Sequence, residues 1–224
     1  MCSSDLELFA RAIHMESGRE GYFVPINCSA IPNELIESEL FGYAAGAFTG
    51  ALKEGRAGKI ELSHRGTLFL DEIGDMPLNM QPKILRVIED GEIIRVGSEK
   101  SLKVNIRVIA ATNKDLAKMV EEGSFRKDLY YRLNSVIINI PPLRERRDDI
   151  PLLANRFVED YCMEYGVNIL SFSPEVMEAL INHDWEGNVR ELNNLVERMV
   201  IMAKNDNVKI IDIEIGRASC RERV

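Results

Sequence analysis

The sequence predicts an α/β fold, in which a three-layer domain built on a parallel sheet is followed by a small domain made only of helices. Two observations lead to this prediction. Short apolar runs typical of buried strands alternate with helical stretches in the first part of the chain. Helical patterns then account for the chain from residue 152 onward. The expected strands lie at residues 22–27, 67–71, 106–111 and 136–140.

Composition narrows the class of protein. The chain has 224 residues, 46% of them hydrophobic, and a net charge of −8, so it can bury a core in one large or two small domains. It has no apolar run long enough to span a membrane and no signal segment, which makes the cytoplasm the expected location. Without a basic run, this piece is not expected to bind nucleic acid by itself. The sequence has no C-x-x-C pair, and its four cysteines are scattered at Cys2, Cys28, Cys162 and Cys220. Neither a zinc site nor a disulfide framework is therefore expected.

The second expected strand ends in two acidic residues. Three apolar residues after Gly66 and Thr67 indicate a fully buried parallel strand, and Asp71 and Glu72 follow. Ligands of open α/β sheets bind beyond the carboxyl ends of the strands. An acidic pair at that place suits a magnesium ion and a water molecule, although a solvated turn remains the alternative.

The neighbouring strands also end in polar residues. The first ends at Asn27, which as a residue type most often forms a turn. The strand at 106–111 is followed by Asn113, again a turn residue on the simplest interpretation. Before it, residues 92–96 and 101–104 are expected to form a hairpin.

Helices are expected at residues 33–40, 82–89 and 152–165. Ser173 is expected to cap a further helix, with Pro174 in its first turn. Asn188 and Glu191 have the N-x-x-E spacing of a capping box at the start of the last helix. The apolar stripe of that helix is expected to be core: Val189, Leu192, Val196, Met199 and Val200.

One glycine-rich stretch suits neither a helix nor a strand, because glycine makes the loss of backbone entropy expensive. It is expected to be a loop with one apolar side chain at its tip, and it consists of Gly46, Ala47, Phe48, Thr49, Gly50 and Ala51. Phe48 either folds back onto its own domain or seeks a partner, because burying a phenylalanine is worth roughly 1.5–3 kcal/mol.

The string GAFTGA at 46–51, with LFG at 40–42, resembles the signature loop of the bacterial enhancer-binding proteins, the AAA+ activators of sigma-54 RNA polymerase. Four further stretches share the resemblance, which covers residues 7–211: the Walker B-like run at 66–72, residues 125–133, the linker at 141–151, and WEGNVREL at 185–192. It implies an AAA+ P-loop NTPase domain over residues 7–142 and a helical lid domain over residues 143–211.

The resemblance also implies a function. The parent protein would be a ring-forming ATPase, a hexamer of identical subunits, that uses ATP and Mg2+ to remodel sigma-54 RNA polymerase holoenzyme and so activates transcription. The loop at 46–51 would touch the sigma factor. DNA would be bound only through a C-terminal domain absent here.

Individual residues acquire roles by the same resemblance. Asp71 would hold magnesium, Glu72 would activate water, and Asn113 would sense the γ-phosphate. Arg126 and Arg132, whose spacing does not place them on one helical face, would be arginine fingers that reach the neighbouring subunit's ATP. Surface ion pairs with residues such as Asp128 are the alternative. The nucleotide-binding residues would be Asn27, Gly66, Thr67, Asp71, Glu72 and Arg190.

The chain departs from the family pattern at its ends. The family's phosphate-binding loop, GESGTGK, would fall on residues 1–6, and Leu6 stands where its lysine should be. We therefore expect residues 1–6 and 212–224 to be non-native ends and the chain to be unable to bind ATP productively. A non-enzymatic interaction fragment and an AAA+ ATPase with another client are the rival interpretations. The second would lack GAFTGA.

The missing start has a structural consequence. In the family fold the first strand lies centrally, between the strand at 106–111 and the last strand at 136–140. Without it, we expect either a slot in the sheet or a collapse of residues 136–140 onto residues 106–111, with aggregation of the isolated chain.

Overall fold

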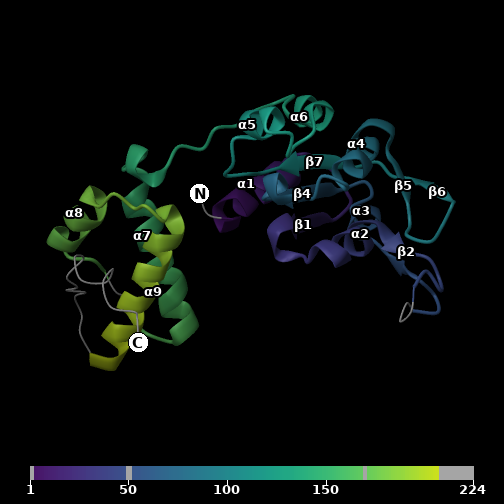
Figure 1. Cartoon of the computed structure of the whole chain (residues 1–224). Coiled ribbons are helices and arrows are strands. Elements are labelled where there is room, and N and C mark those ends of the chain that lie inside the picture. Colours follow the sequence, from purple (N-terminus) through teal and green to yellow (C-terminus); the bar gives the residue numbers. More distant parts are fainter. Residues whose placement is uncertain (1–2, 49–51, 169–170, 207–224) are drawn as a thin grey trace, which may run out of the picture. The chain divides into compact units, whose positions relative to one another are not determined.

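The computed structural model describes residues 3–48, 52–168 and 171–206 (Figure 1). The chain divides into two compact units, Ser3–Ile138 and the part that begins at Asn139. The division falls a few residues before the predicted domain boundary at residue 142.

The first unit alternates helices with short strands, as predicted. Its elements in chain order are α1 (Ser3–Met15), β1 (Phe23–Asn27), the 3-10 turn η1 (Cys28–Ala30), α2 (Asn33–Phe41), β2 (Gly42–Tyr43), β3 (Arg56–Ala57), α3 (Lys59–Leu62), β4 (Thr67–Asp71), the 3-10 turn η2 (Ile73–Asp75), α4 (Gln81–Asp90), β5 (Glu92–Ile94), β6 (Ser101–Lys103), β7 (Arg107–Ala110), α5 (Leu116–Glu121) and α6 (Lys127–Leu133).

Three parallel strands form the central sheet in the order β1-β4-β7. All five residues of β4 are buried, because it lies between the other two strands and is covered on both faces. Asn27 at the end of β1 lies opposite Asp71 at the end of β4, and Leu70 lies opposite Ala110 of β7. The carboxyl ends of the three strands therefore meet at one edge of the sheet.

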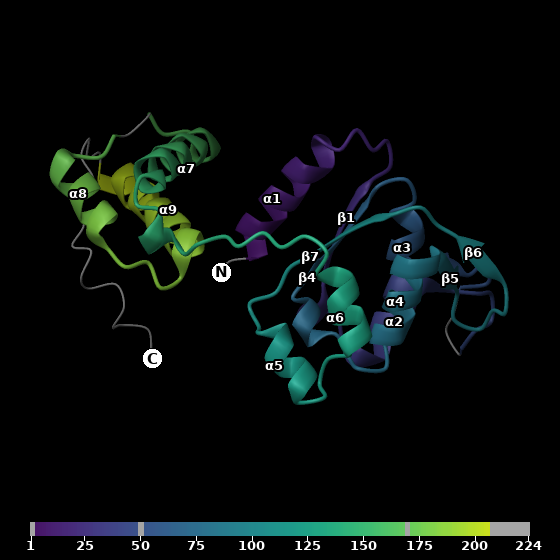
Figure 2. The ribbon, with the colours of Figure 1, turned by 90° about the horizontal axis from the view of Figure 1, so that it is seen from above.

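Helices cover both faces of this sheet, which gives the three layers that the sequence predicts. On one face, α1 packs against β4, where His14 Nδ1 lies 2.9 Å from Thr67 Oγ1 and the Phe23 and Phe69 rings stack. The opposite face contributes Leu68 and Leu70 to the main apolar core, together with α2, α3, α4 and α6. Figure 2 shows α1 and the α2–α4 group on opposite sides of the strands.

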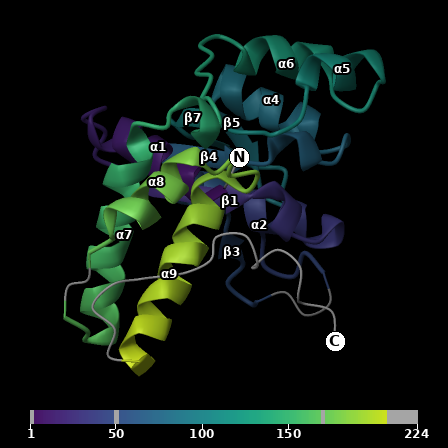
Figure 3. The same cartoon turned by 90° about the vertical axis from the view of Figure 1, so that its left-hand side faces the viewer.

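The second unit is helical throughout its described residues. It contains the 3-10 turn η3 (Leu143–Glu145), α7 (Asp149–Tyr165), α8 (Pro174–Asn182) and α9 (Asn188–Asp206). Helices α7 and α9 lie side by side (Figure 3). The predicted stripe of α9 is buried in this core. The predicted cap is also confirmed, since Ser173 Oγ accepts a hydrogen bond from the Val176 N–H.

Of the two residues predicted to form a capping box at the start of α9, Glu191 acts as a cap and Asn188 does not. Asn188 has φ of 53°, in the left-handed region, and its side chain does not cap the helix. Its buried amide oxygen instead accepts a hydrogen bond of 2.8 Å from the Leu143 N–H of the linker. Glu191 does act as a cap, because its carboxylate accepts the N–H of Gly187. Asn188 therefore fastens η3 to the helical unit.

The predicted strand at residues 136–140 is also wrong, because no strand forms there. Val136, Ile137 and Ile138 are 82%, 63% and 64% exposed. Neither do these residues collapse onto β7, whose one partner among the described residues is β4. A parallel strand is stable only where a neighbour satisfies its backbone, and here no described strand takes that place.

We predict that Asn188→Ala lowers the free energy of unfolding by about 1–3 kcal/mol, because the buried Leu143 N–H loses its acceptor. Asn188→Asp is the matched control, since it keeps an oxygen at the same place and tolerates the left-handed backbone. Urea denaturation of both variants measures the difference. Equal stability of Asn188→Ala and the parent chain would contradict the role of the Asn188–Leu143 bond.

Candidate functional site

The site is built at the carboxyl edge of the sheet. Asp71 is the last residue of β4, and Glu72 follows with φ of 52° and ψ of 46°. A left-handed backbone is strained for glutamate, and such strain is concentrated at functional sites. The turn after Glu72 is joined to the end of β7, because the Ile73 N–H donates a hydrogen bond of 3.0 Å to the Ala111 carbonyl.

The two carboxylates are held in different ways. Asp71 is 3% exposed, and its Oδ1 accepts the Glu72 N–H at 3.1 Å. Glu72 Oε2 is buried and has no hydrogen-bond partner among the described residues. Leaving a buried carboxylate oxygen unpaired is costly, so the arrangement suits a ligand that supplies the missing contact. Two carboxylates at a strand end are the donor set that Mg2+ and an activated water require.

Cys28 belongs to the same acidic cluster, although the sequence gave no reason to place it there. It lies in η1, directly after Asn27, and is buried. Burial, reinforced by the negative charges of Asp71, Asp75 and Glu72, raises the pKa of its thiol from 9.0 to about 12. The thiol is therefore neutral at physiological pH, and it contributes no further negative charge beside the carboxylates.

The two asparagines predicted as nucleotide sensors follow the strands that flank β4: Asn27 is the last residue of β1, and Asn113 lies three residues after the end of β7. Asn27 Oδ1 accepts hydrogen bonds from the Ser29 N–H at 3.0 Å and the Ser29 hydroxyl at 2.7 Å, so it forms the turn that its residue type suggested. Asn113 is exposed in the turn after β7. That turn is tied to the acidic one, because Lys114 Nζ pairs with Asp75 Oδ1 at 2.6 Å.

The structure does not bring Gly66 and Thr67, which the resemblance assigns to nucleotide binding, to this edge of the sheet. Both stand at the amino end of β4, a strand's length from Asp71. A Cβ on Gly66 would lie 2.0 Å from the Tyr22 carbonyl oxygen, and Thr67 is fully buried against His14. Close packing of β4 onto β1 and α1 explains both residues.

The three arginines predicted to contact nucleotide are exposed. Arg126 precedes α6 and bonds Asp128 through Nε and Nη2, at distances down to 2.6 Å. The bonded guanidinium lowers the pKa of the Asp128 carboxyl. Arg132 makes one long contact, 3.4 Å from Nη2 to the Ile88 carbonyl. Arg190 lies in the helical unit, near the start of α9.

Arg126 also borders an open depression of about 460 Å³ at the start of α6. Its other lining residues are Lys127, Asp128 and Tyr131. The Lys127 ammonium lies 5.9 Å from the centre of the Tyr131 ring. This surface thus combines two cations, one carboxylate and one exposed aromatic ring.

The predicted loop leaves the domain on a narrow base formed by β2 and β3. A Cβ on Gly42 would lie 2.3 Å from the Arg56 carbonyl oxygen, and one on Gly58 would lie 2.3 Å from that of Leu40. The two segments can approach so closely only because both residues are glycine. Phe48 is 47% exposed and meets the Tyr43 ring edge-on at 5.0 Å. Thr49, Gly50 and Ala51 lie outside the described residues.

The loop base is fastened to the confirmed hairpin β5–β6. The Ala44 N–H donates to the Val96 carbonyl and the Val96 N–H donates to the Gly42 carbonyl, each at 2.9 Å. Beside them, Arg95 forms a two-pronged ion pair with Glu61 at 3.0 and 2.7 Å. A fork of this kind fixes orientation as well as distance.

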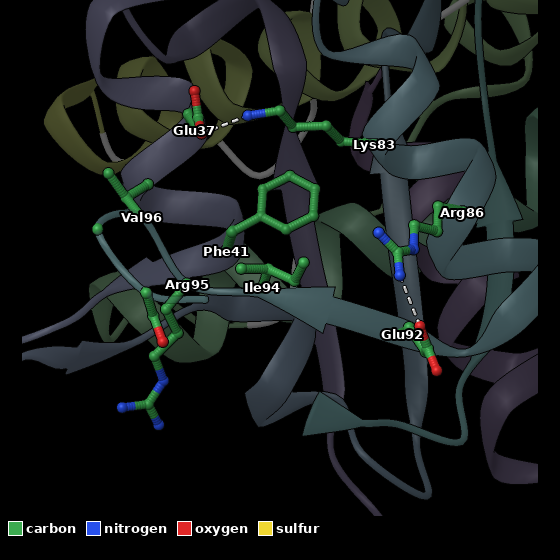
Figure 4. A pocket seen from close by; sticks show the side chains of 10 residues that line it. Glu37, Phe41, Lys83, Arg86, Glu92, Ile94, Arg95 and Val96 are labelled. Carbon is green, nitrogen blue, oxygen red and sulfur yellow. Dashed lines mark hydrogen bonds and ion pairs between the residues drawn. The ribbon is translucent and has the colours of Figure 1, made fainter. Parts of the chain in front are cut away.

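A groove of about 350 Å³ runs between α2, α4 and the hairpin. Figure 4 shows Phe41 and Ile94 in this groove, with Lys83 paired to Glu37 and Arg86 paired to Glu92. Each cation of the groove, Arg95 included, is therefore matched by a carboxylate. The ion pairs across the groove connect the elements that line it. Among the described residues that line the groove, no cation is left unpaired to bind an anionic ligand.

Comparisons with known proteins agree with this geometry. The fold is that of the AAA+ ATPases: a chain of Hsp104 shares it at a TM-score of 0.64 and 18% identity, covering 92% of this chain and 40% of that one. Residues 4–139 match the sigma-54 interaction domain, and residues 144–217 match the AAA+ ATPase lid domain. The chain belongs to the family of sigma-54-dependent transcriptional activators.

Individual relatives support the assignment. The Nif-specific regulatory protein of Herbaspirillum seropedicae is 48% identical over 219 residues, covering 97% of this chain and 40% of that protein. The regulatory protein AtoC of Escherichia coli is 51% identical over 197 residues, covering 88% and 42%. NtrX of Brucella abortus in complex with ATP has a TM-score of 0.85 and 38% identity, covering 99% and 50%. The chain thus spans about two fifths of the length of each of these two curated relatives.

Two further properties concern the described part of the chain alone. None of its helices has the length and apolar character needed to cross a membrane. It also has no group of three or more histidine, cysteine, aspartate or glutamate side chains placed to hold a metal ion. A magnesium ion at Asp71 would accordingly take its other ligands from water or phosphate.

We predict that native Cys28 is alkylated by iodoacetamide at least tenfold more slowly than unfolded Cys28 at pH 9.0, where the unfolded thiol is half ionised. The pKa of about 12 leaves it protonated. As the pH rises from 9.0 toward the pKa of about 12, the thiol ionises in the unfolded chain but not in the folded chain. The free energy of unfolding therefore falls over this pH range. Peptide mass spectrometry with and without urea measures the rates, and equal rates would contradict a buried, acid-flanked thiol.

Proposed function

We propose that this chain corresponds to the part of a sigma-54-dependent activator that, in a longer chain with a phosphate-binding loop, couples ATP hydrolysis to remodelling of sigma-54 RNA polymerase holoenzyme. The observation that carries the proposal is the loop at 46–51. Phe48 is exposed on this loop, and the two segments that lead into and out of the loop approach closely at Gly42 and Gly58. The first of these segments is also hydrogen-bonded to the β5–β6 hairpin. A contact residue on such a base moves with the domain core, which suits a lever that acts on a partner.

The acidic edge would supply the energy for that lever. Asp71 would hold the magnesium side of the nucleotide, and Glu72, with its unpaired buried oxygen, would orient the attacking water. Asn113 would contact the γ-phosphate, and Asn27 would exchange its bond to Ser29 for one to Glu72. Each role rests on the shared edge where β1, β4 and β7 end.

The phosphate-binding part of the site does not fit. A phosphate loop needs glycines that expose backbone N–H groups and a lysine that reaches the phosphates. Residues 3–15 are instead helical, with Leu6 inside α1, and no lysine precedes Lys53 in the sequence. The acidic edge therefore fits Mg2+ and water, whereas the described residues 3–15 form a helix and supply no glycine-rich turn for a phosphate. A non-enzymatic interaction fragment is accordingly the second candidate function.

Arg126 and Arg132 would act between subunits of a ring. Both lie on an exposed surface, as a residue must if it is to reach a neighbouring subunit. Arg126 would first have to leave Asp128, and an ion pair on an exposed surface is weak because water screens both charges. Contact with the transferring phosphate can be worth about 10³–10⁵ in rate, so the exchange is favourable.

We predict that this chain shows no ATP turnover, because it offers neither the glycine loop nor its lysine. A phosphate-release assay with Mg2+ and ATP measures it, and Glu72→Ala is the control for a contaminating ATPase. Turnover that disappears in Glu72→Ala would overturn the prediction and establish catalysis by the acidic edge.

In a longer chain that carries a phosphate-binding loop, we predict that Phe48→Ala leaves ATPase activity largely intact and weakens sigma-54 binding by roughly 10- to 150-fold. That factor corresponds to the burial of one phenylalanine. Binding is measured by titration in the presence of a transition-state analogue. Thr49→Ala should behave in the same way.

Two further variants sharpen this experiment. Leu52→Ala removes an exposed apolar side chain just outside the loop, and binding equal to the parent is expected. Arg132→Ala should lose turnover, which returns in part when its subunits are mixed with Glu72→Ala subunits if the arginine acts on the neighbour. Full binding by Phe48→Ala would exclude the lever role, and failure of the mixture would exclude action between subunits.

A further inference from the structure

One buried side-chain amide joins two parts of the proposed site. Gln81 is the first residue of α4 and is fully buried. Its Nε2 donates hydrogen bonds to the Met76 carbonyl at 3.0 Å and to the Ser124 carbonyl at 3.2 Å. Its Oε1 accepts the Arg126 N–H at 2.7 Å. The amide nitrogen and the amide oxygen of one side chain are thus both bonded to backbone groups, as burial of an amide requires.

The partners of Gln81 lie in segments that are far apart in the sequence. Met76 directly follows η2, the turn that begins after the acidic pair. Ser124 and Arg126 lie just before α6, which packs against α4 (Figure 2). Phe125 between them is buried in the main core. A single side chain therefore fixes the position of the segment that carries Arg126 relative to the acidic turn.

Arg126 has two attachments of different kinds. Its guanidinium pairs with Asp128 on an exposed surface. Its N–H precedes α6 and has no carbonyl partner inside that helix, so Gln81 supplies the acceptor. When the guanidinium leaves Asp128 for a phosphate, as proposed above, the bond to Gln81 still holds the backbone from which the side chain extends.

We propose that Gln81 is a positioning residue for Arg126. It holds the Arg126 backbone at a fixed place beside the acidic turn, so that the released guanidinium extends from one defined point toward the neighbouring subunit. This inference rests on the proposed role of Arg126 between subunits. Misplacing a group that contacts the reacting atoms by about 1 Å can cost about 100-fold in rate, so a residue that never touches the nucleotide can still control turnover.

Amide hydrogen exchange in the 224-residue chain, followed by NMR, tests the attachment without nucleotide. Gln81→Met keeps the length of the side chain and removes its hydrogen-bonding atoms. We expect the Arg126 N–H to exchange about tenfold faster, whereas the Phe125 N–H, which donates to the Met119 carbonyl at 3.1 Å, keeps its parent rate. Gln81→Glu is the conservative variant, because it retains an oxygen for the Arg126 N–H, and it should keep slow exchange. An unchanged Arg126 rate in Gln81→Met, or equal acceleration of both amides, would overturn the proposal.

Turnover in a longer chain that carries a phosphate-binding loop tests the consequence. Gln81→Met should lower kcat about 10- to 100-fold and leave KM for ATP unchanged, because Arg126 acts on the transferring phosphate. Adding Gln81→Met to Arg126→Ala should lower kcat no further, since Gln81 acts through Arg126. Mixing Gln81→Met subunits with Glu72→Ala subunits should restore part of the turnover, because the Glu72→Ala subunits supply an intact Arg126 to their neighbours.

The outcomes separate this inference from the proposed function. Full turnover by Arg126→Ala would exclude the role of Arg126 itself, and the positioning role would fall with it. Full turnover by Gln81→Met, where Arg126→Ala is inactive, would overturn the positioning role alone. A loss in Gln81→Met that the mixture does not restore would show that Gln81 acts on the acidic turn of its own subunit, which excludes action through Arg126. If circular dichroism shows Gln81→Met to be unfolded, Gln81→Asn, whose amide is one methylene shorter, takes its place with the same expectations.

Discussion

The burial of β4 between β1 and β7 is the constraint on which the rest of this structure depends. A strand covered on both faces and both edges has one position in which its backbone and its side chains are all satisfied. That position sets the carboxyl ends of three strands level, and it holds Asp71 and Glu72 against the turns that follow the other two. The acidic site is thus a consequence of strand register, and the strain at Glu72 is tolerated because the surrounding sheet fixes it.

A second constraint, close backbone approach, governs the loop. Gly42 and Gly58 let two segments pass at a distance that any side chain would forbid, and the hairpin then bonds to the loop base through Val96. Phe48 is half exposed, whereas the base of the loop is hydrogen-bonded to the hairpin. A loop that transmits a displacement of the core to a partner needs both an exposed contact residue and a base that is bonded to the core.

Much of this architecture follows from local pattern. Apolar continuity identified β4, helical periodicity identified the buried stripe of α9, and two short runs on either side of residues 97–100 identified the β5–β6 hairpin. The errors arose where a residue's partner is distant in sequence. Asn188 looked like a cap, but its amide oxygen accepts the Leu143 N–H of the linker. Residues 136–140 have strand composition, yet composition cannot supply the neighbour that a strand requires. Nothing in the sequence around Cys28 predicted that its thiol would lie beside the acidic residues at the end of β4.

At Glu72, the residue type that would best suit the left-handed backbone differs from the residue type that the proposed function requires. A glycine there would relieve a strain of about 1–2 kcal/mol, and it would also remove the buried, unpaired carboxylate oxygen that the fold now has to accommodate. The substitution most favourable to folding is therefore the one that deletes the expected base. Selection for activity would therefore keep glutamate at position 72, whereas selection for stability would favour glycine there.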